Sequence, residues 1–214
     1  MVYRDATPRK VTKKQQVLDA LASGRPMRFA EVRKIAGSYI PIQELIEEGR
    51  IVRVAEGIYG LPEQHQDWNS LATLGLRYPN AVVCLDTAAA YHQLTTQNPH
   101  DVFAAFPYGK TVGPRHNESW VRSFRWREKP MGVGVEKINI SGVEVQITSA
   151  ARTVVDLLRF RSRRGDDEQA IEALNSFMEK NGDMKSLIQF SKLLNCENSV
   201  RPFTTALSGL RNQL

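Results

Sequence analysis

The first 62 residues contain three short amphipathic segments in succession, and this limits the possible folds more than any other feature of the sequence. Apolar residues recur at helical spacing in residues 12–23, 28–36 and 39–48, and a glycine follows each segment. An apolar stripe of this spacing must be buried, and glycine commonly ends a helix. The pattern therefore predicts three consecutive helices.

The third predicted helix is the most informative of the three. Ser38 is expected to be its N-cap, because a serine hydroxyl can accept a hydrogen bond from the first turn of a helix. Its buried face should consist of Ile42, Leu45 and Ile46, which directs Gln43 away from the core.

The sequence then changes its periodicity. Residues 51–54 and 58–61 are expected to be short strands joined by a turn at 55–57, which is the pattern of a β-hairpin. Three helices followed at once by a hairpin is the order found in winged helix-turn-helix domains. We assign this domain to residues 1–64, with a linker at 63–67. The alternative is a small α+β domain with no DNA-binding role.

The rest of the chain, residues 65–214, is expected to form a mixed α/β domain with a helical tail from about residue 161, so the fold class is α+β. Helices are expected at 67–77, at 86–94 with Asp86 as the N-cap, at 149–161, and near 166–181 and 183–194. Strands are expected at 81–85, 102–106, 138–140 and 143–147.

The net charge of +6 favours an anionic partner, and much of this charge lies in the predicted helix-turn-helix. Residues 1–34 hold nine basic and three acidic residues, a formal charge of +6 in that segment alone. Two further basic stretches are residues 115–129 and 152–164. Trp120, Phe124 and Trp126, which lie in the first of these, are expected to be core residues rather than a platform for stacking bases.

The helix-turn-helix interpretation assigns roles to particular residues, because the start of the third helix enters the major groove in such folds. Ser38, Tyr39 and Gln43 are expected to contact bases or phosphates. The residues expected to neutralise DNA phosphates are Lys13, Lys14, Arg28, Arg33, Lys34, Arg50 and Arg53. For each of these cations taken singly, a solvated surface charge is the favoured interpretation, and only the group as a whole indicates DNA binding.

Several other classes of protein are disfavoured. The 42% hydrophobic content is that of a globular protein, no run of 18 apolar residues suggests a membrane span, and the N-terminus lacks the apolar stretch of a secretion signal. The two cysteines, Cys84 and Cys196, are far apart and fit a reducing compartment, so we expect a cytoplasmic protein without disulfides.

No catalytic, metal-binding or cofactor-binding motif is apparent, so we expect no enzyme activity, no metal and no cofactor. A metal-dependent nuclease of the restriction-endonuclease-like type remains an alternative, because such α/β domains often accompany DNA-binding modules. Its acidic residues would be Asp101 and Glu144, but Gln146 stands where that site requires a lysine.

Three segments together resemble the AbiEi-type antitoxins of type IV toxin–antitoxin (abortive-infection) systems. They are GIYGLP at the end of the predicted wing, VVCLDTAAAYHQLTTQNPHDVFAAFP, and INISGVEVQITSAARTVVDLL, and the resemblance spans roughly residues 12–160. Residues 87–95 match an alanine-rich helix of that family and residues 151–156 match its later "ERTLxD"-like segment, with Gln93 and Ala151 departing from the usual residues.

The resemblance implies a transcriptional repressor that binds inverted repeats in its own promoter, as a monomer or weak dimer on double-stranded DNA. It also implies that the second domain counteracts a nucleotidyltransferase-like toxin, without requiring a stable complex. A module that binds the toxin but not DNA is a further alternative. Within the second domain, Arg152 and Asp156 are spaced to pair on one helix face and are candidate antitoxin residues, although a surface or helix-anchoring ion pair is favoured.

Overall fold

The protein has a mixed α+β fold with two separate sheets. The structure, a computed structural model, describes residues 11–62, 69–109, 113–114 and 119–211. The predicted linker at 63–67 and the first three basic residues of the N-terminal segment, Arg4, Arg9 and Lys10, lie outside these ranges. Within the described part of the chain, no helix combines the length and apolar character needed to cross a membrane.

The chain divides into two compact units. The first unit comprises Met1–Arg77 together with Asn139–Val143, and the second comprises Tyr78–Ile138 and Glu144–Leu214. The first unit therefore extends beyond residue 64, where the sequence places the domain boundary, and takes in the helix α4 (Asn69–Arg77).

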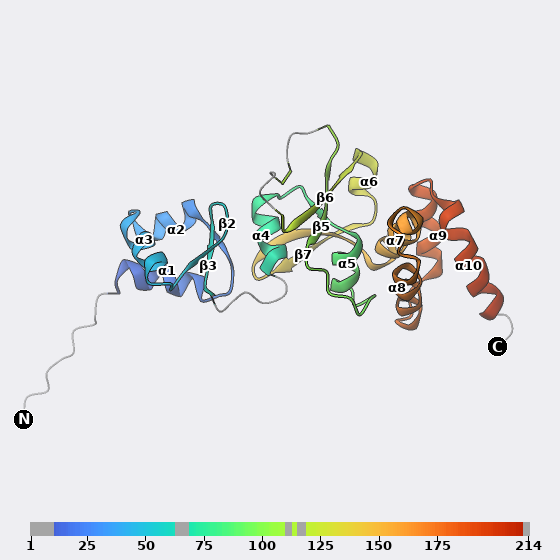
Figure 1. The fold of residues 1–214 in the computed structure, drawn as a ribbon, viewed down its shortest axis with the longest axis horizontal. Helices are drawn as coiled ribbons and strands as arrows, with labels where there is room; N and C mark the ends of the chain where they lie inside the picture. The colour runs from blue at the N-terminus through green and yellow to red at the C-terminus, as the bar shows by residue number, and fades with distance from the viewer. Residues whose placement is uncertain (1–10, 63–68, 110–112, 115–118, 212–214) are drawn as a thin grey trace, which may run out of the picture. The chain divides into compact units, whose positions relative to one another are not determined.

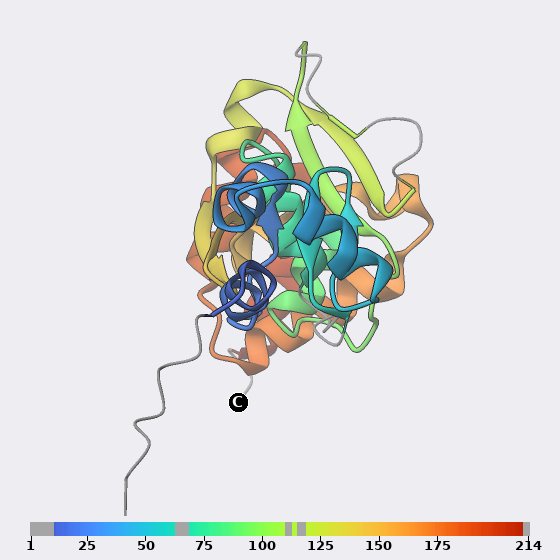
Figure 2. The ribbon, with the colours of Figure 1, turned by 90° about the vertical axis from the view of Figure 1, so that its left-hand side faces the viewer.

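The first unit contains three helices and a small antiparallel sheet with the strand order β1-β3-β2. Figure 1 and, from a second direction, Figure 2 show the three blue helices gathered beside the strands. The elements are α1 (Lys13–Leu21), β1 (Met27–Arg28), α2 (Phe29–Ala36), α3 (Ile40–Glu47), β2 (Val52–Ala55) and β3 (Ile58–Gly60). The three predicted helices and the predicted hairpin are confirmed, whereas the strand β1 was not predicted.

The third helix departs from the prediction in two details. Its N-cap is Tyr39 rather than Ser38, and no side chain caps it. Ile42 and Leu45 are fully buried as expected, but Ile46 is 37% exposed. The chain reverses directly after α3, where the N–H of Ile51 donates to the Leu45 carbonyl at 3.2 Å. Ile51 is thereby buried in the core, and Ile46 is left on the outer side.

The second unit is built on a five-stranded mixed sheet with the order β6-β5-β4-β8-β7. β4 is antiparallel to β5 and parallel to β8, and β5 is parallel to β6. Its elements are β4 (Val82–Val83), α5 (Leu85–Tyr91), β5 (Val102–Pro107), β6 (Val121–Trp126), α6 (Glu128–Gly132), β7 (Val135–Ile140), β8 (Val143–Thr148), α7 (Ala150–Arg164), α8 (Asp167–Glu179), α9 (Met184–Leu193) and α10 (Glu197–Arg211).

Two predictions for this unit are wrong in detail. The strand predicted at 81–85 is confined to Val82–Val83, because the helix α5 already begins at Leu85. The N-cap of α5 is Cys84, and Asp86 lies in the first turn instead. β6, α6 and α10 were not predicted. The helix predicted at 149–161 is confirmed as α7, and its N-cap is Ser149, whose hydroxyl accepts a hydrogen bond from the Arg152 N–H.

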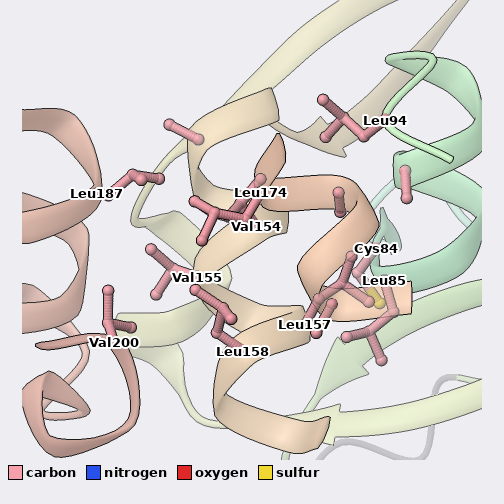
Figure 3. Close-up of a cluster of buried hydrophobic side chains, with 14 of the residues drawn as sticks. Cys84, Leu85, Leu94, Val154, Val155, Leu157, Leu158, Leu174, Leu187 and Val200 are labelled. Atoms are coloured by element: carbon pink, nitrogen blue, oxygen red, sulfur yellow. The ribbon is translucent and has the colours of Figure 1, made fainter. Parts of the chain in front are cut away.

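The core of the second unit is centred on α7. Figure 3 shows Val154, Val155, Leu157 and Leu158 projecting from this helix on several sides. α7 packs against α5, α8, α9 and α10, and Leu174, Leu187 and Val200 from the last three of these complete the cluster. Residues 151–158 are all buried, the polar Arg152, Thr153 and Asp156 included, so this part of α7 is enclosed on every side. Trp126 belongs to this cluster and Phe124 packs against it, as expected, whereas Trp120 is half-buried and is not among the residues of the cluster.

Candidate functional site

The exposed face of α3 carries the residues expected to read DNA bases. Ser38 and Tyr39 precede the helix and are exposed, Tyr39 at 48%. The Tyr39 and Phe29 rings meet edge to face, with their centroids 6.1 Å apart. Gln43 lies one turn further along and is also exposed, as predicted. Its amide Nε2 donates to Glu47 Oε1 at 3.0 Å, so a carboxylate already occupies the donor that would contact a base.

The C-terminal half of α3 is acidic, and Lys14 neutralises part of it. The Lys14 ammonium lies 2.6 Å from Glu44 Oε2 and 2.7 Å from Glu48 Oε1. Hydrogen bonds to these two carboxylates raise the pKa of Lys14 above its ordinary value. Lys14 therefore joins α1 to α3, and a phosphate would have to compete with two carboxylates for it.

Arg28 is also engaged within the unit. Its guanidinium donates a hydrogen bond to the Leu76 carbonyl, and its N–H donates to Glu31 Oε2 at 2.9 Å. Glu31 also pairs with Arg25 at 3.1 Å. Burial alone would raise the pKa of Glu31, but the Arg28 N–H and the Arg25 guanidinium outweigh it and lower the pKa. The Glu31 carboxylate therefore caps the start of α2 by accepting from the Arg28 N–H.

Four of the predicted phosphate contacts remain available. Arg33 and Lys34 lie in the last turn of α2, Arg50 follows α3, and Arg53 lies on β2. All four are exposed, and none has an acidic partner within 4.0 Å among the residues that the structure describes. Lys13 is exposed as well, with its ammonium 3.1 Å from Gln16 Oε1.

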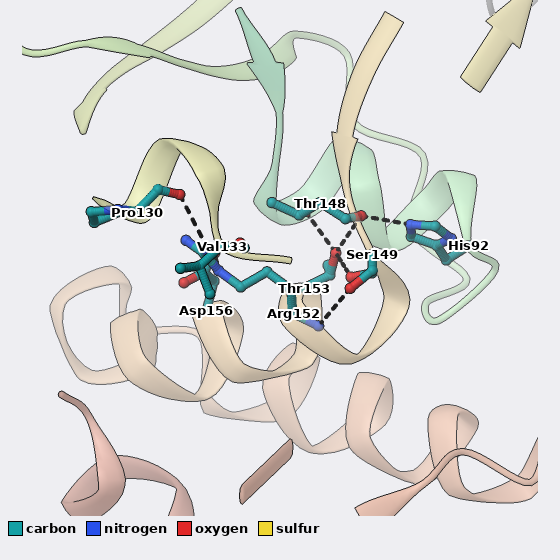
Figure 4. A network of polar contacts seen from close by, with 8 residues as sticks. All are labelled: His92, Pro130, Val133, Thr148, Ser149, Arg152, Thr153 and Asp156. Atoms are coloured by element: carbon teal, nitrogen blue, oxygen red, sulfur yellow. Dashed lines mark hydrogen bonds and ion pairs between the residues drawn. The ribbon is translucent and has the colours of Figure 1, made fainter. Parts of the chain in front are cut away.

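Arg152 and Asp156 form an ion pair buried inside the second unit rather than at its surface. Arg152 Nε donates to Asp156 Oδ2 at 2.8 Å, and both side chains are at most 1% exposed. The Arg152 Nη1 group also donates to the carbonyls of Pro130 (3.2 Å) and Val133, and the guanidinium lies over the Trp126 ring at 4.8 Å from its centre. Figure 4 shows Arg152 reaching from α7 toward these two carbonyls.

The hydrogen-bonding groups of Asp156 are less completely used than those of Arg152. Its second oxygen, Oδ1, is buried and has no hydrogen-bond partner in the structure. Burial raises the pKa of Asp156, and the nearby Arg152 charge opposes this only in part. The pair thus anchors α7 to the segment from α6 to β7, which agrees with the favoured helix-anchoring interpretation.

A polar network surrounds the start of α7, as Figure 4 also shows. The Thr153 hydroxyl lies 2.8 Å from that of Thr148 and donates to the Ser149 carbonyl at 2.9 Å. His92 Nε2 lies 2.7 Å from the Thr148 carbonyl oxygen. These contacts join the end of β8 to α5 and α7, and so fix the direction in which α7 leaves the sheet.

The acidic residues considered for a nuclease are each engaged in an ion pair. Asp101 lies 3.5 Å from Arg122, and Glu144 lies 2.8 Å from Lys137. Within the described ranges, no three side chains of the histidine, cysteine, aspartate or glutamate type are grouped so that they could hold a metal ion.

Sequence reasoning missed a group of basic residues that the second unit brings together. Arg127 and Lys129, at the start of α6, line the same cleft as Arg152 and Arg159 of α7. The basic stretches at 115–129 and 152–164 were noted as a signal, but their proximity depends on the tertiary fold.

Comparison with known proteins shows the fold alone. No model of a protein family and no curated protein sequence matches the chain. Among solved structures, the chain is similar to the Rv2827c protein of Mycobacterium tuberculosis, with a TM-score of 0.50 and 16% sequence identity. The alignment covers 92% of this chain and 81% of that one.

Proposed function

We propose that the first unit is a winged helix-turn-helix module that binds double-stranded DNA. The observation that carries this proposal is the order α1-β1-α2-α3-β2-β3, in which α3 follows α2 after a short turn and the β2–β3 hairpin follows α3. In domains of this order, the helix before the hairpin lies in the major groove and the hairpin lies beside the backbone.

The charges on this unit favour one mode of docking. The N-terminal end of α3, with Ser38 and Tyr39, would enter the groove, because the other half carries Glu44, Glu47 and Glu48. Arg33 and Lys34, which form no ion pair with a described residue, precede that end of α3, because only a few residues separate α2 from α3. Arg53 on the β2 strand would contact the backbone from the wing.

For the whole protein, we propose a transcriptional repressor that also acts as an antitoxin, of the AbiEi type. The support is the resemblance of the segments at 57–62, 82–107 and 138–158 to that family. The second unit would counteract a nucleotidyltransferase-like toxin, and the protein would itself catalyse no reaction. The operator would be an inverted repeat upstream of the gene.

Fluorescence anisotropy with the full-length chain tests DNA binding. We expect the labelled duplex from upstream of the gene to bind more tightly than a scrambled duplex of the same composition. Lys34→Ala should weaken binding to both duplexes and reduce the slope of log affinity against log salt by about one. The matched control is Lys185→Ala, an exposed lysine of the second unit, which should change neither value. Equal affinity for the two duplexes would contradict the proposal.

The antitoxin role is tested separately by co-expression. A nucleotidyltransferase encoded beside this gene should arrest growth when expressed alone, and the full-length chain should restore growth. Arg33→Ala/Lys34→Ala should still restore growth, because the proposal assigns toxin antagonism to the second unit. Failure of the wild-type chain to restore growth would contradict the antitoxin role and leave the DNA-binding result unaffected.

A further inference from the structure

The second unit contains a cleft of about 550 Å³ beside α7, which we call the α7 cleft. The side chains that matter for the argument come from the start of α6, from one face of α7 and from the end of α9. They are Arg127, Lys129, Arg152, Asp156, Arg159 and Asn195. We propose that this cleft binds a small molecule of nucleotide size that carries phosphate groups.

The charge of the cleft is the first argument. Arg152, Asp156 and Arg159 recur at intervals of four and three residues, so they project from the same face of α7. Asp156 is the one acidic residue that lines the cleft among the residues described, and its charge is already matched by Arg152. Arg125, Arg127, Lys129 and Arg159 therefore leave an excess of four positive charges in the lining of the cleft.

Arg127, Lys129 and Arg159 form no ion pair with a described residue, although the Arg159 charge acts with that of Arg152 to oppose the rise in the pKa of Asp156. Arg127 and Lys129 are exposed, and Arg159 is half-buried. Within the described residues, none of the three has a carboxylate within 4.0 Å, although Arg159 lies over the Phe160 ring at 5.1 Å. Like charges held close together repel each other unless an anion joins them. An anion with several negative charges would relieve this repulsion.

The shape and rigidity of the cleft favour a ligand larger than a simple ion. Its volume is within the range of small-molecule sites, about 300–1,000 Å³. The Arg152 side chain is held by Asp156, two carbonyls and the Trp126 ring, so it forms a rigid wall of the cleft rather than a contact for the ligand.

Arginine and lysine are the side chains that recognise phosphate best, because guanidinium groups donate paired hydrogen bonds and ammonium groups act as point charges. A carboxylate ligand would use the same donors, but one or two carboxylates supply less charge than a di- or triphosphate. Asn195, at the end of α9, adds a neutral amide that can accept or donate hydrogen bonds. Phosphate groups joined to a polar small molecule therefore match this lining best.

Isothermal titration calorimetry of the full-length chain tests the proposal with ATP, AMP, inorganic phosphate and adenosine as probes. We expect ATP to bind most tightly, AMP and phosphate progressively more weakly, and adenosine not to bind. The variants Arg127→Gln/Lys129→Gln and Arg159→Gln should each weaken ATP binding by about tenfold or more, because each removes charge that contacts phosphate. Arg163→Gln, an exposed arginine of the same helix outside the cleft, is the matched control and should leave ATP affinity unchanged.

The outcomes decide the proposal whether or not the first unit binds DNA. Arg127 and Lys129 are exposed, so their replacement should preserve the fold, which circular dichroism would verify. Absence of binding by every phosphate probe at about 1 mM, or equal weakening by Arg163→Gln, would overturn the proposal. Displacement of ATP by duplex DNA in the Arg33→Ala/Lys34→Ala variant would also overturn it, since the cleft would then be a nucleic-acid contact.

Discussion

Gly134 and Arg152 approach each other so closely that a Cβ on the glycine would lie 2.9 Å from the Arg152 Cβ. The same position lies 2.9 Å from the Phe190 ring, and the Gly134 backbone has a φ of +63°. The segment after α6 can therefore pass against α7 and α9 only because residue 134 has no side chain. This contact places the Val133 carbonyl where Arg152 can donate to it.

The first prediction follows from this close approach. Gly134→Ala should destabilise the second unit by about 2–5 kcal/mol, since it combines a left-handed backbone with overpacking against another residue's Cβ. Gly132→Ala is the matched control: a Cβ there meets nothing within 4 Å, so the change should stay within about 1 kcal/mol. Urea denaturation followed by tryptophan fluorescence measures both. Equal effects of the two substitutions would show that the contact is unimportant.

The second prediction concerns the buried ion pair. Arg152→Met and Asp156→Leu should each cost about 3–5 kcal/mol, because each leaves one buried charge without its partner. The double variant should cost much less than the two single variants together, because it leaves no buried charge. A double-mutant cycle by urea denaturation measures this difference. Additive single effects would mean that the pair is not coupled as its 2.8 Å contact indicates.

The third prediction is a pH dependence in the first unit. The folded protein lowers the pKa of Glu31 below its ordinary value of 4.5, so ionised Glu31 stabilises the fold. This stabilisation is complete above the unfolded pKa and is lost as the pH falls through the lowered folded pKa. Glu31→Gln should therefore be less stable than the wild type at pH 7, with the difference shrinking below about pH 4.5. A difference that grows on acidification would contradict this assignment.

Local signals in the sequence predicted much of the fold. The first helix was predicted to begin at residue 12, and the Thr12 hydroxyl caps it by accepting the Gln15 N–H at 3.2 Å. Ser149 begins α7, and the turn at residues 141–142 joins β7 to β8. In each case, the interacting residues are only a few positions apart, so a short stretch of sequence is enough to predict the interaction.

Elements that depend on distant partners could not be predicted in this way. β1 is two residues long and exists because Met27 pairs with Tyr59 on β3, more than 30 positions away. β6 carries Arg122 and Arg125, whose spacing of three breaks the alternation expected of a strand, and it is defined by its parallel pairing with β5, for instance Phe103 with Arg122. Neither strand has a regular alternation of apolar and polar residues that would distinguish it from a loop in the sequence.

The same limit applies to the candidate sites. Lys14 looked like a phosphate contact because its basic neighbours are near in sequence, but its partners Glu44 and Glu48 lie on another helix. The pairing of Arg152 with Asp156 was predictable from their spacing of four residues. Their complete burial was not, since it depends on the Trp126 ring and on the chain near Val133.

The fourth prediction concerns the acidic residue beside Gln43. Glu47→Gln should increase affinity for the upstream duplex, because it removes a negative charge near the DNA and weakens the hold on the Gln43 amide. The salt dependence should change little, since no phosphate contact is gained. Glu179→Gln, at the end of α8 in the second unit, serves as the control and should have no effect. Unchanged binding by Glu47→Gln would mean that Glu47 and the Gln43 amide lie too far from the DNA to affect it, and weaker binding would contradict the electrostatic argument.

The most direct test of the account is a DNase footprint of the full-length chain on the DNA upstream of its gene. We expect two protected stretches, with centres separated by about one or two helical turns, roughly 10–21 base pairs. Both should disappear with Arg33→Ala/Arg53→Ala, which removes one cation from α2 and one from β2 of the first unit. No protection, or a protection pattern that this double variant leaves unchanged, would contradict the claim that the first unit binds DNA.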